Sequence, residues 1–465
     1  MRVLARKLLR IVAAVTIGLP VLLVVLVGLY GLMGQPGLWP APLTGVRLEP
    51  WRPLVRESDI GPDNAFRHLL GRRRLDPWPA DVRAEYEAVF LHDQWPAEFP
   101  AMQRWIREHE DFFDAWDRFG SETNCVIPTA EDARERRWDM GEGRQCKWFL
   151  HARTAPTAAR GDWIAMSDLW TKTIQAGQNL TRGGPLLARG IGQSMAFAVC
   201  RDMRLRTERS AIDPSVGTVM IAFLRRTEEA AEPLAEAVRY DRIAIRNEMV
   251  RPDFDQGPDR FVEFDRWEGP FVKCMACLGG GVRVRVRNAD SIYSRIIHGC
   301  ELPYPNDMAE QIHSIEMTST GARFRRVLDP VTYAFLFYVN AGEQFDRIHF
   351  PCDLRGTRTF LAVRLYQAEH DGRPPARLSD LVPRYLDAVP MDPFTGDREP
   401  LKYRLGTDGT WSVYAVGPNG LDDGGLFDWR TDFDHREQAD FAFHSDELRR
   451  MREPAEAALR ARAAR

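Results

Sequence analysis

The sequence predicts a mainly α-helical protein with an N-terminal transmembrane helix, a domain of helical hairpins and a small α+β module near the C-terminus. Three observations lead to this fold class. An uncharged apolar run follows the first ten residues, amphipathic helical patterns recur between residues 50 and 353, and two alternating runs lie between residues 400 and 417. The chain has 465 residues, 44% of them hydrophobic, which is enough for two or three domains with cores of their own.

The first expected element is a membrane anchor at residues 11–34. Its sequence, IVAAVTIGLPVLLVVLVGLYGLMG, contains no charge and is long enough to cross a hydrocarbon core of about 30 Å. A signal peptide would have a shorter apolar core and a small-residue cleavage site, so an uncleaved anchor is favoured over it, and also over a buried core helix. Residues 1–10 carry Arg2, Arg6, Lys7 and Arg10 and should stay in the cytoplasm. The rest of the chain is then expected in the periplasm, behind a single pass of the bacterial inner membrane.

A helical domain is expected over residues 50–353. Between Met102 and Phe119 the aromatic and aliphatic residues recur at the spacing of one helix face. Similar patterns begin at Asp162 (DWIAMSDLWTKTIQ), Pro185 (PLLARGIGQSMAFAVCRDM) and Glu232 (EPLAEAVRYDRIAIRNEM). Such helices are expected to pack as antiparallel hairpins.

This region contains no recognised catalytic motif. HExxH, GxSxG and SxxK are absent from it, and the glycines at 279–281 lack the lysine of a phosphate-binding loop. We therefore name no catalytic residue. The charge balance also argues against nucleic acid as a partner, since 63 basic and 66 acidic residues are mixed along the chain for a net charge of −3.

Seven cysteines are expected to lie in an oxidising compartment, where thiols tend to pair. Cys125 and Cys146 flank a charged, loop-like stretch, and a disulfide that closes it would contribute about 3 kcal/mol. Cys274 and Cys277 form a CxxC that three glycines follow closely, which is unlike a thioredoxin-type motif, and a zinc site would need four clustered ligands. Structural disulfides or inert thiols are favoured over redox or metal roles. Cys200, within MAFAVC, is expected to be a small buried hydrophobe.

The region at residues 354–446 has a different pattern. An apolar-striped helix at 358–368 (RTFLAVRLYQA) precedes a short helix bounded by prolines. PLKYRLG and TWSVYAVG then alternate as strands, and Asp408 and Gly409 between them indicate a hairpin because such residues accept positive φ. A glycine-rich acidic loop, VGPNGLDDGG, follows at 416–425. Residues 447–465 are rich in Arg and Ala and are expected to form a helix or tail.

This order of elements resembles the C-terminal region of the type II secretion major pseudopilin over about 75 residues. The residues that carry the resemblance are Tyr366, Gly372, Pro374, Leu378, Leu381, Val382, Pro383, Tyr385, Leu386, Pro390, Asp392, Pro393, Gly396, Leu401, Tyr403, Tyr414, Gly417, Gly420, Asp422 and Gly424. In that family the acidic loop binds calcium, which the resemblance assigns here to Asn419, Asp422 and Asp423. Calcium takes six to eight oxygen ligands, and Asp432, or its neighbours Asp428 and Asp434, would supply another. The alternative is an ordinary solvated Asp-Gly turn without metal.

Two features depart from a pseudopilin. Residues 10–14 (RIVAA) contain neither the prepilin cleavage site nor the glutamate of that family, and some 300 residues separate the span from the module. As a whole the chain resembles uncharacterised membrane-anchored bacterial proteins that join a helical domain to such a module. That resemblance implies an architecture but no activity.

Three functions are compatible with these features. The first is a non-enzymatic binding or scaffold protein of the cell envelope, with the membrane and an envelope protein as partners. The second is a hydrolase-type envelope enzyme whose site lies between the helical domain and the module, with Glu108 and Asp111 as acidic candidates. The third is a component of a type II secretion-like apparatus. A deep pocket with paired carboxylates would favour the enzyme.

Overall fold

The structure of the protein is a computed structural model. It describes residues 60–70, 75–90, 98–127, 141–250 apart from 183 and 185, 293, 294, 297, 300, 330–417, 420–422, 424–425 and 440–443. The expected anchor at 11–34, its flank at 1–10 and the tail at 447–465 lie outside these ranges. Among the described helices, none is both long and apolar enough to cross a membrane.

The chain divides into two compact units. The smaller unit comprises residues 1–53, 238–302 and 307–342, and the larger comprises 54–237, 303–306 and 343–465. Helix α9 (Leu234–Val250) begins in the larger unit, and α14 (Pro330–Glu369) ends in it. All side chains discussed below belong to the larger unit.

The first part of the larger unit is a group of helices around aromatic side chains. Its elements are η3 (Ala65–Leu69), α2 (Ala80–Phe90), α3 (Pro100–Glu108), α4 (Glu110–Ser121) and α5 (Gly141–Ala159). Phe66, Trp105, Phe119 and Phe149 are buried in one cluster of this part. Trp105 and Trp116, which belong to the helical pattern between Met102 and Phe119, are therefore core residues.

Three longer helices follow, α6 (Trp163–Thr181), α7 (Leu186–Arg209) and α8 (Pro214–Glu229). Asp162 caps α6 by accepting a hydrogen bond from the backbone N–H of Ala165 at 3.0 Å. Asp213 caps α8, where Pro214 stands at the first helical position and needs no hydrogen bond. The helices predicted from residues 162, 185 and 232 are confirmed.

The C-terminal part consists of the end of α14, two short 3-10 helices and an antiparallel sheet. The elements are η6 (Leu378–Leu381), η7 (Pro393–Thr395), β1 (Lys402–Leu405), β2 (Trp411–Ala415) and β3 (Phe441–Phe443), with strand order β1-β2-β3. The predicted hairpin is confirmed, with Tyr403 opposite Val413 and a positive φ of 83° at Gly409. The third strand was not predicted.

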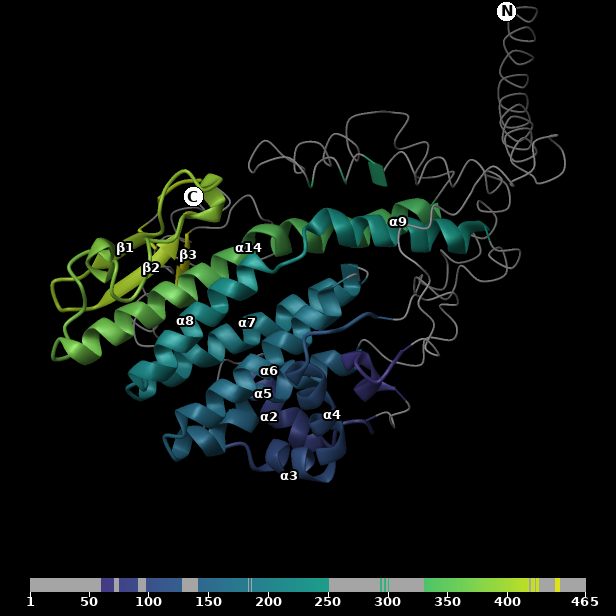
Figure 1. Cartoon of the computed structure of the whole chain (residues 1–465), viewed down its shortest axis with the longest axis horizontal. Helices are drawn as coiled ribbons and strands as arrows, with labels where there is room; N and C mark the ends of the chain where they lie inside the picture. Colours follow the sequence, from purple (N-terminus) through teal and green to yellow (C-terminus); the bar gives the residue numbers. More distant parts are fainter. Residues whose placement is uncertain are drawn as a thin grey trace, which may run out of the picture. The chain divides into compact units, whose positions relative to one another are not determined.

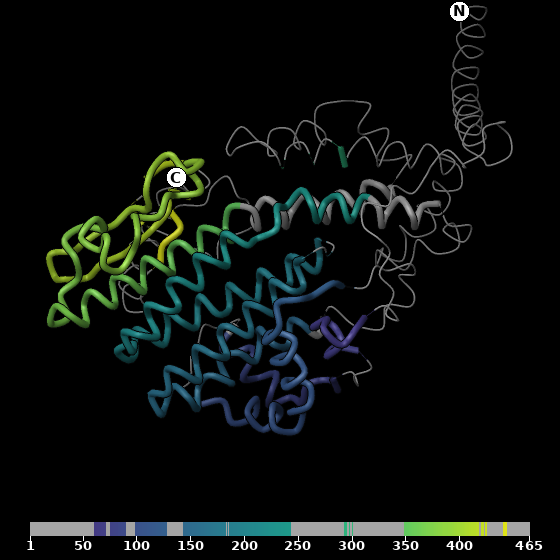
Figure 2. Tube along the Cα trace, in the orientation of Figure 1, coloured from purple at the N-terminus to yellow at the C-terminus, as the bar shows by residue number. Residues whose placement is uncertain are grey.

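Helix α14 connects the sheet to the helices. Figures 1 and 2 show its C-terminal half running beside α8, with the sheet on its other side. A Cβ atom at Gly217 of α8 would lie 2.8 Å from Leu365, and one at Gly356 would lie 2.1 Å from the Phe443 ring of β3. The absence of a side chain at Gly356 therefore lets α14 pack closely against β3, whereas at Gly217 a Cβ would meet only the end of the flexible Leu365 side chain.

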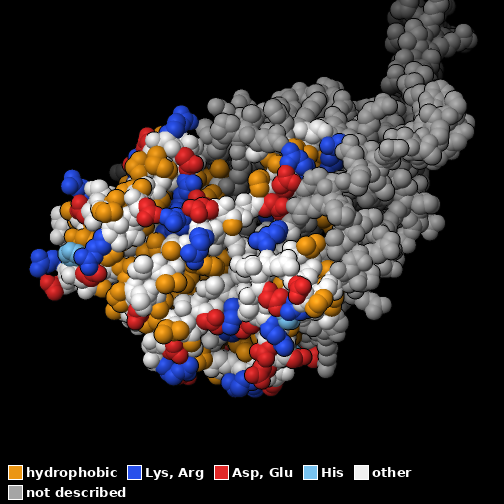
Figure 3. Space-filling model, viewed as in Figure 1, with side chains coloured by type: hydrophobic (Ala, Val, Ile, Leu, Met, Phe, Trp, Pro, Cys, Tyr) orange, Lys and Arg blue, Asp and Glu red, His pale blue; other side chains and the backbone are white. Residues whose placement is uncertain are grey.

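The hydrophobic core runs across the domain boundary that the sequence suggested. That boundary, between 353 and 354, lies inside α14, and buried residues from α6, α7 and α8 belong to the same cluster as Val413 of β2. Cys200 is fully buried in this cluster, as predicted. The surface is mixed in charge: Figure 3 shows Lys and Arg interspersed with Asp and Glu over the described residues of the face drawn.

Candidate functional site

A pocket lies where the C-terminal halves of α6 and α8 meet the first half of α7. The space between its walls, open solvent included, is about 450 Å³. Its walls include Gln178 of α6, Arg189 and Gln193 of α7, and Thr227 of α8, together with Phe350 of α14. The pocket therefore brings polar side chains of three helices together with an apolar side chain of α14.

A close helix crossing forms one side of the pocket. A Cβ atom at Gly177 of α6 would lie 2.5 Å from the carbonyl oxygen of Gly192, and one at Gly192 of α7 would lie 2.3 Å from that of Gly177. Both glycines belong to the pocket wall. The backbones of α6 and α7 therefore touch at this point. The larger side chains on either side of the crossing form the walls of the pocket.

The polar side chains of the pocket are largely buried. Arg189 is 6% exposed and donates a hydrogen bond from Nη1 to the carbonyl oxygen of Glu232 at 2.5 Å. Gln178 donates from Nε2 to the carbonyl oxygen of Thr227 at 3.3 Å. The Thr227 hydroxyl is buried and has no hydrogen-bond partner among the described residues. Burying a hydroxyl without a partner costs about 1–3 kcal/mol, so a group in the pocket that bonds to it would gain from doing so.

A second buried polar group lies deeper, between α5, α6 and α7. Asp202 accepts hydrogen bonds from His151 Nδ1 at 2.7 Å, Trp170 Nε1 at 2.8 Å and Arg206 Nε at 3.3 Å. Burial alone would raise the pKa of Asp202, but its bonds to these cationic and N–H groups lower it. Asp202 and His151 are both almost inaccessible to solvent, so this group holds three helices together and has no access to a substrate.

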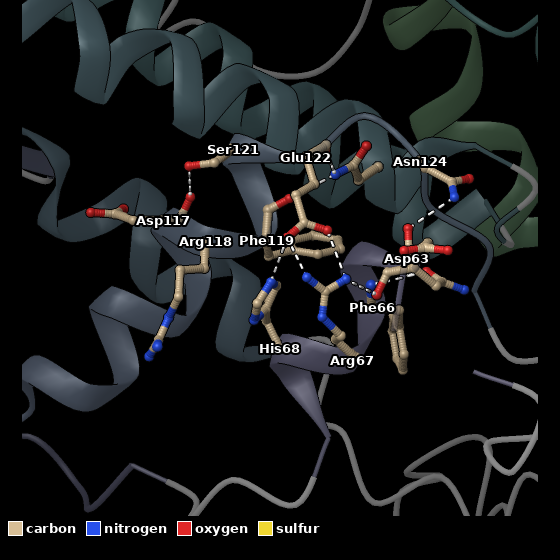
Figure 4. A network of polar contacts seen from close by, with 12 residues as sticks. Asp63, Phe66, Arg67, His68, Asp117, Arg118, Phe119, Ser121, Glu122 and Asn124 are labelled. Atoms are coloured by element: carbon tan, nitrogen blue, oxygen red, sulfur yellow. Dashed lines mark hydrogen bonds and ion pairs between the residues drawn. The ribbon is translucent and has the colours of Figure 1, made fainter. Parts of the chain in front are cut away.

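A third polar group fixes η3 to the end of α4 (Figure 4). Glu122 accepts hydrogen bonds from the two terminal nitrogens of Arg67 at 2.9 and 2.6 Å and from His68 Nε2 at 2.8 Å. These bonds, that of His68 first, lower the pKa of Glu122. Asn179 of α6 donates from Nδ2 to the carbonyl oxygens of Phe119 and Glu122, each at 2.8 Å. The carboxylate is engaged by partners from its own chain, which indicates a structural role.

The predicted calcium ligands fall mostly outside the described residues. The structure does not describe Asn419, Asp423 or Asp432, and of the four it describes only Asp422. Its Oδ1 accepts hydrogen bonds from the Tyr414 hydroxyl and the backbone N–H of Gly424, both at 3.1 Å. Within the described ranges no group of three or more His, Cys, Asp or Glu residues is placed to hold a metal ion. The calcium site stays a prediction.

The cysteine pair Cys125 and Cys146 is buried in the aromatic cluster, and both residues are thiols in the structure. The disulfide that their spacing suggested is therefore not formed in it. Burial raises the pKa of Cys125 to about 12, so this thiol is unreactive near neutral pH. Cys274 and Cys277 lie outside the described residues.

Sequence reasoning missed the pocket residues. The stretch that contains Arg189 and Gln193 was assigned only to an amphipathic helix that begins at Pro185. Ser194, beside them, donates a hydrogen bond to the carbonyl oxygen of Ile191 at 2.7 Å. A usable signal was present, because Arg189 and Gln193 are four residues apart on a helix otherwise built there of small and apolar residues. Such residues share one face of the helix. Glu108 and Asp111 do not contribute to the pocket wall.

Comparisons with protein families, with curated proteins and with solved structures found no match.

Proposed function

We propose that the protein is a non-enzymatic binding protein of the bacterial cell envelope. Residues 11–34 anchor it in the inner membrane as a single pass, residues 1–10 stay in the cytoplasm, and the remainder faces the periplasm. The observation that carries this proposal is the pocket among α6, α7 and α8. It combines the nearly buried polar groups of Arg189, Gln193 and Thr227 with apolar walls from Ile174 and Phe350, a mixture typical of sites for small molecules.

The chemistry of the pocket supports binding over hydrolysis. Among the described residues that line it, Glu232 is the one carboxylate, and none is a Ser, Cys or His. Hydrolytic sites of the kinds considered for this sequence need either two carboxylates or a nucleophile next to a base. This lining offers hydrogen-bond donors and a positive charge, which can hold a ligand without transforming it.

The calcium loop belongs to the same proposal as a stabilising element. Asn419, Asp422, Asp423 and Asp432 would hold the ion, and the bonds from Tyr414 and Gly424 already fix the position of the Asp422 carboxylate. The loop follows β2 directly, and β2 packs in the core that also contains α7 and α14. An ion bound there would stabilise the core cluster in which Phe350 of the pocket wall is buried.

The full-length chain, purified from membranes into lipid nanodiscs, tests the proposal by native mass spectrometry. We expect a small molecule to remain bound to the wild type. Ala231→Trp should remove it, because Ala231 lines the pocket and its replacement fills the space. Ala159→Trp, at an exposed position at the end of α5, is the matched control and should retain it. Equal ligand content in the two variants, or none in the wild type, would contradict the proposal.

A further inference from the structure

We propose that the groove filled by β3 is an interaction surface for a second copy of the chain, whose own β3 can occupy it by strand exchange. Neither the pocket among α6, α7 and α8 nor a ligand in it is needed for this exchange. Three features of the larger unit lead to it: the place of β3 in the sheet, the side chains that hold the strand, and the contacts that keep the groove in shape without it.

β3 stands at one edge of the sheet and is joined to it by a long connection. It has three residues, of which Ala442 lies opposite Tyr414 of β2. The strand order is β1-β2-β3, so β3 can leave without breaking the hairpin of β1 and β2. Residues 416–440 connect β3 to β2, and a chain of that length can span up to about 80 Å. The strand can therefore reach the groove of another molecule.

Two aromatic side chains hold β3 in its groove. Phe441 and Phe443 are two residues apart and so share one face of the strand. The Phe441 ring lies edge-on to His349 of α14, with centroids 5.0 Å apart. Phe443 is buried against α14, where a Cβ atom at Gly356 would lie 2.1 Å from its ring, and the Arg204 guanidinium lies 5.5 Å from the ring centroid. Backbone pairing and sites for alternate side chains are the means by which proteins bind an added strand.

The walls of the groove are fixed by contacts that do not involve β3. β2 pairs with β1 over four residue pairs. Arg204 donates a hydrogen bond from Nη1 to Asp353 Oδ1 at 2.7 Å, and the His349 ring packs edge-on against Phe394 with centroids 5.2 Å apart. Gly356 lies within α14. An entering strand therefore meets a groove that is already formed, and binding does not carry the cost of ordering it.

A second copy of the chain carries the segment that fits this groove. The groove is complementary to Phe441–Phe443, and every copy contains the same three residues. Exchange of an identical element replaces each contact by the same contact from another chain, which makes it a low-cost route to a dimer. The chain's own strand competes at an effective concentration of about 1 mM, so at a chain concentration of about 0.1 mM about one groove in ten should hold the strand of another copy.

Disulfide cross-linking between two differently tagged full-length chains in detergent micelles measures the exchange. One chain carries Tyr414→Cys and the other Ala442→Cys, because these residues lie opposite each other across β2 and β3. A chain with both substitutions shows whether the two cysteines can form a disulfide. Each single variant mixed with wild type measures the background from the seven native cysteines. We expect about one chain in ten to cross-link at about 0.1 mM.

Two further substitutions separate the groove from the strand. Gly356→Ala closes the groove of its own chain, because its Cβ would meet the Phe443 ring, and Phe443→Ala removes that ring from the strand. A chain with Gly356→Ala and Ala442→Cys then has only an intact strand, and one with Phe443→Ala and Tyr414→Cys only an intact groove. We expect this complementary pair to cross-link about 5-fold more than the plain cysteine pair, since exchange is its only way to fill a groove.

The matched control contains the same four substitutions in the other arrangement. Gly356→Ala is combined with Tyr414→Cys, and Phe443→Ala with Ala442→Cys, so that the chain offering the groove has it closed and the chain offering the strand lacks the ring. This pair should not cross-link above background. A loss of stability would affect both arrangements alike, because their substitutions are the same.

Cross-linking that follows the complementary arrangement supports strand exchange. A disulfide within the doubly substituted chain, together with no product between chains in the plain and complementary pairs, means that β3 stays in its own chain and overturns the proposal. Equal cross-linking of the two arrangements also overturns it, because the chains then meet elsewhere. If the doubly substituted chain forms no disulfide, β2 and β3 lack the register on which exchange depends, and the proposal falls. The plain pair decides if melting curves show that the other chains do not fold.

Discussion

Asp202 is a single charged residue in the middle of α7 that joins three helices. Its carboxylate is ionised and can only accept hydrogen bonds, so His151 donates from a protonated Nδ1, and burial lowers the pKa of His151 and keeps the ring neutral. Arg206 then supplies the positive charge that compensates Asp202. The group replaces apolar packing at the meeting point of α5, α6 and α7 with directional bonds.

Replacing this carboxylate by an amide tests its role in stability. Asp202→Asn should lower the free energy of unfolding by about 3–5 kcal/mol, because it leaves Arg206 buried without its counter-charge and turns an N–H group toward a donor. Asp168→Asn is the control, since its salt bridge with Lys172 is mostly exposed and should be worth less than about 1 kcal/mol. Urea unfolding at pH 7 measures both. A loss for Asp202→Asn no larger than that of the control would contradict the prediction.

Asp392 should make stability depend on pH in the opposite direction from an ordinary carboxylate. Burial raises its pKa to about 6, although the backbone N–H groups of Val416 and Phe394 donate to it. Between about pH 4 and 6 the folded chain holds a proton that the unfolded chain has released. Stability from this group is therefore present at low pH and is lost as pH rises to about 6, by up to about 3 kcal/mol.

The measurement compares wild type with Asp392→Asn, which cannot titrate. The difference in unfolding free energy between them should change by up to about 3 kcal/mol between pH 4 and 7. The wild type should become less stable relative to Asp392→Asn as pH rises. Parallel curves for the two proteins would show that Asp392 titrates alike in the folded and unfolded chain. Other groups cancel in this comparison because both proteins contain them.

At the scale of elements, the crossing of α6 and α7 depends on two glycines. Gly177→Ala should lower the free energy of unfolding by about 1–3 kcal/mol, although Ala favours a helix by about 1 kcal/mol, because its Cβ would meet the Gly192 carbonyl at 2.5 Å. Gly217→Ala on α8 is the matched control, since its Cβ would meet only the end of the Leu365 side chain, which can move. Thermal melting measures both. If Gly177→Ala is as stable as the control, the helices can separate without cost.

The elements also show what periodicity can and cannot predict. The apolar stripe from Met102 to Phe119 was correctly assigned to a buried helical face, but the structure divides it at His109, where φ is −125° and ψ is 35°. The spacing of apolar residues predicts which face of a helix is buried. It does not predict whether the backbone turns within the pattern and divides it into two helices. The acidic pair Glu110 and Asp111 was the available sign, because acidic residues favour the first turn of a helix.

Long-range pairing escaped prediction for a related reason. The hairpin of β1 and β2 was predicted because its turn is local, whereas β3 pairs with β2 across more than 25 residues and has only three residues of its own. The pocket likewise depends on Arg189, Thr227 and Phe350, which lie on three different helices and are far apart in the sequence. Patterns among neighbouring residues do not predict such long-range contacts, so the mainly helical fold with its C-terminal hairpin was predictable and the candidate site was not.

At the scale of the whole molecule, a group of charges fastens α14 to α8. Glu228 of α8 accepts hydrogen bonds from Arg355 Nε at 2.6 Å and from Arg358 Nη2 at 2.7 Å. Arg355 also donates to the carbonyl oxygen of Met391 at 2.8 Å and pairs with Asp397. Through Arg355, the Glu228 carboxylate therefore connects α8 and α14 to the loop that precedes the sheet. The helices and the sheet also share one hydrophobic core.

This arrangement predicts that the helices and the sheet of the larger unit unfold together. Glu228→Gln leaves the largely buried Arg358 without its counter-charge and Arg355 with Asp397 alone, and we expect it to cost about 2–3 kcal/mol. If the core is continuous, hydrogen exchange of the slowest amides in α7 and in β2 should accelerate by the same factor, about 30- to 150-fold. Glu229→Gln, exposed beside it, should change neither. A change confined to β2 would mean that the C-terminal part opens as a separate module, as the sequence had suggested, because a cooperative unit can lose protection only as a whole.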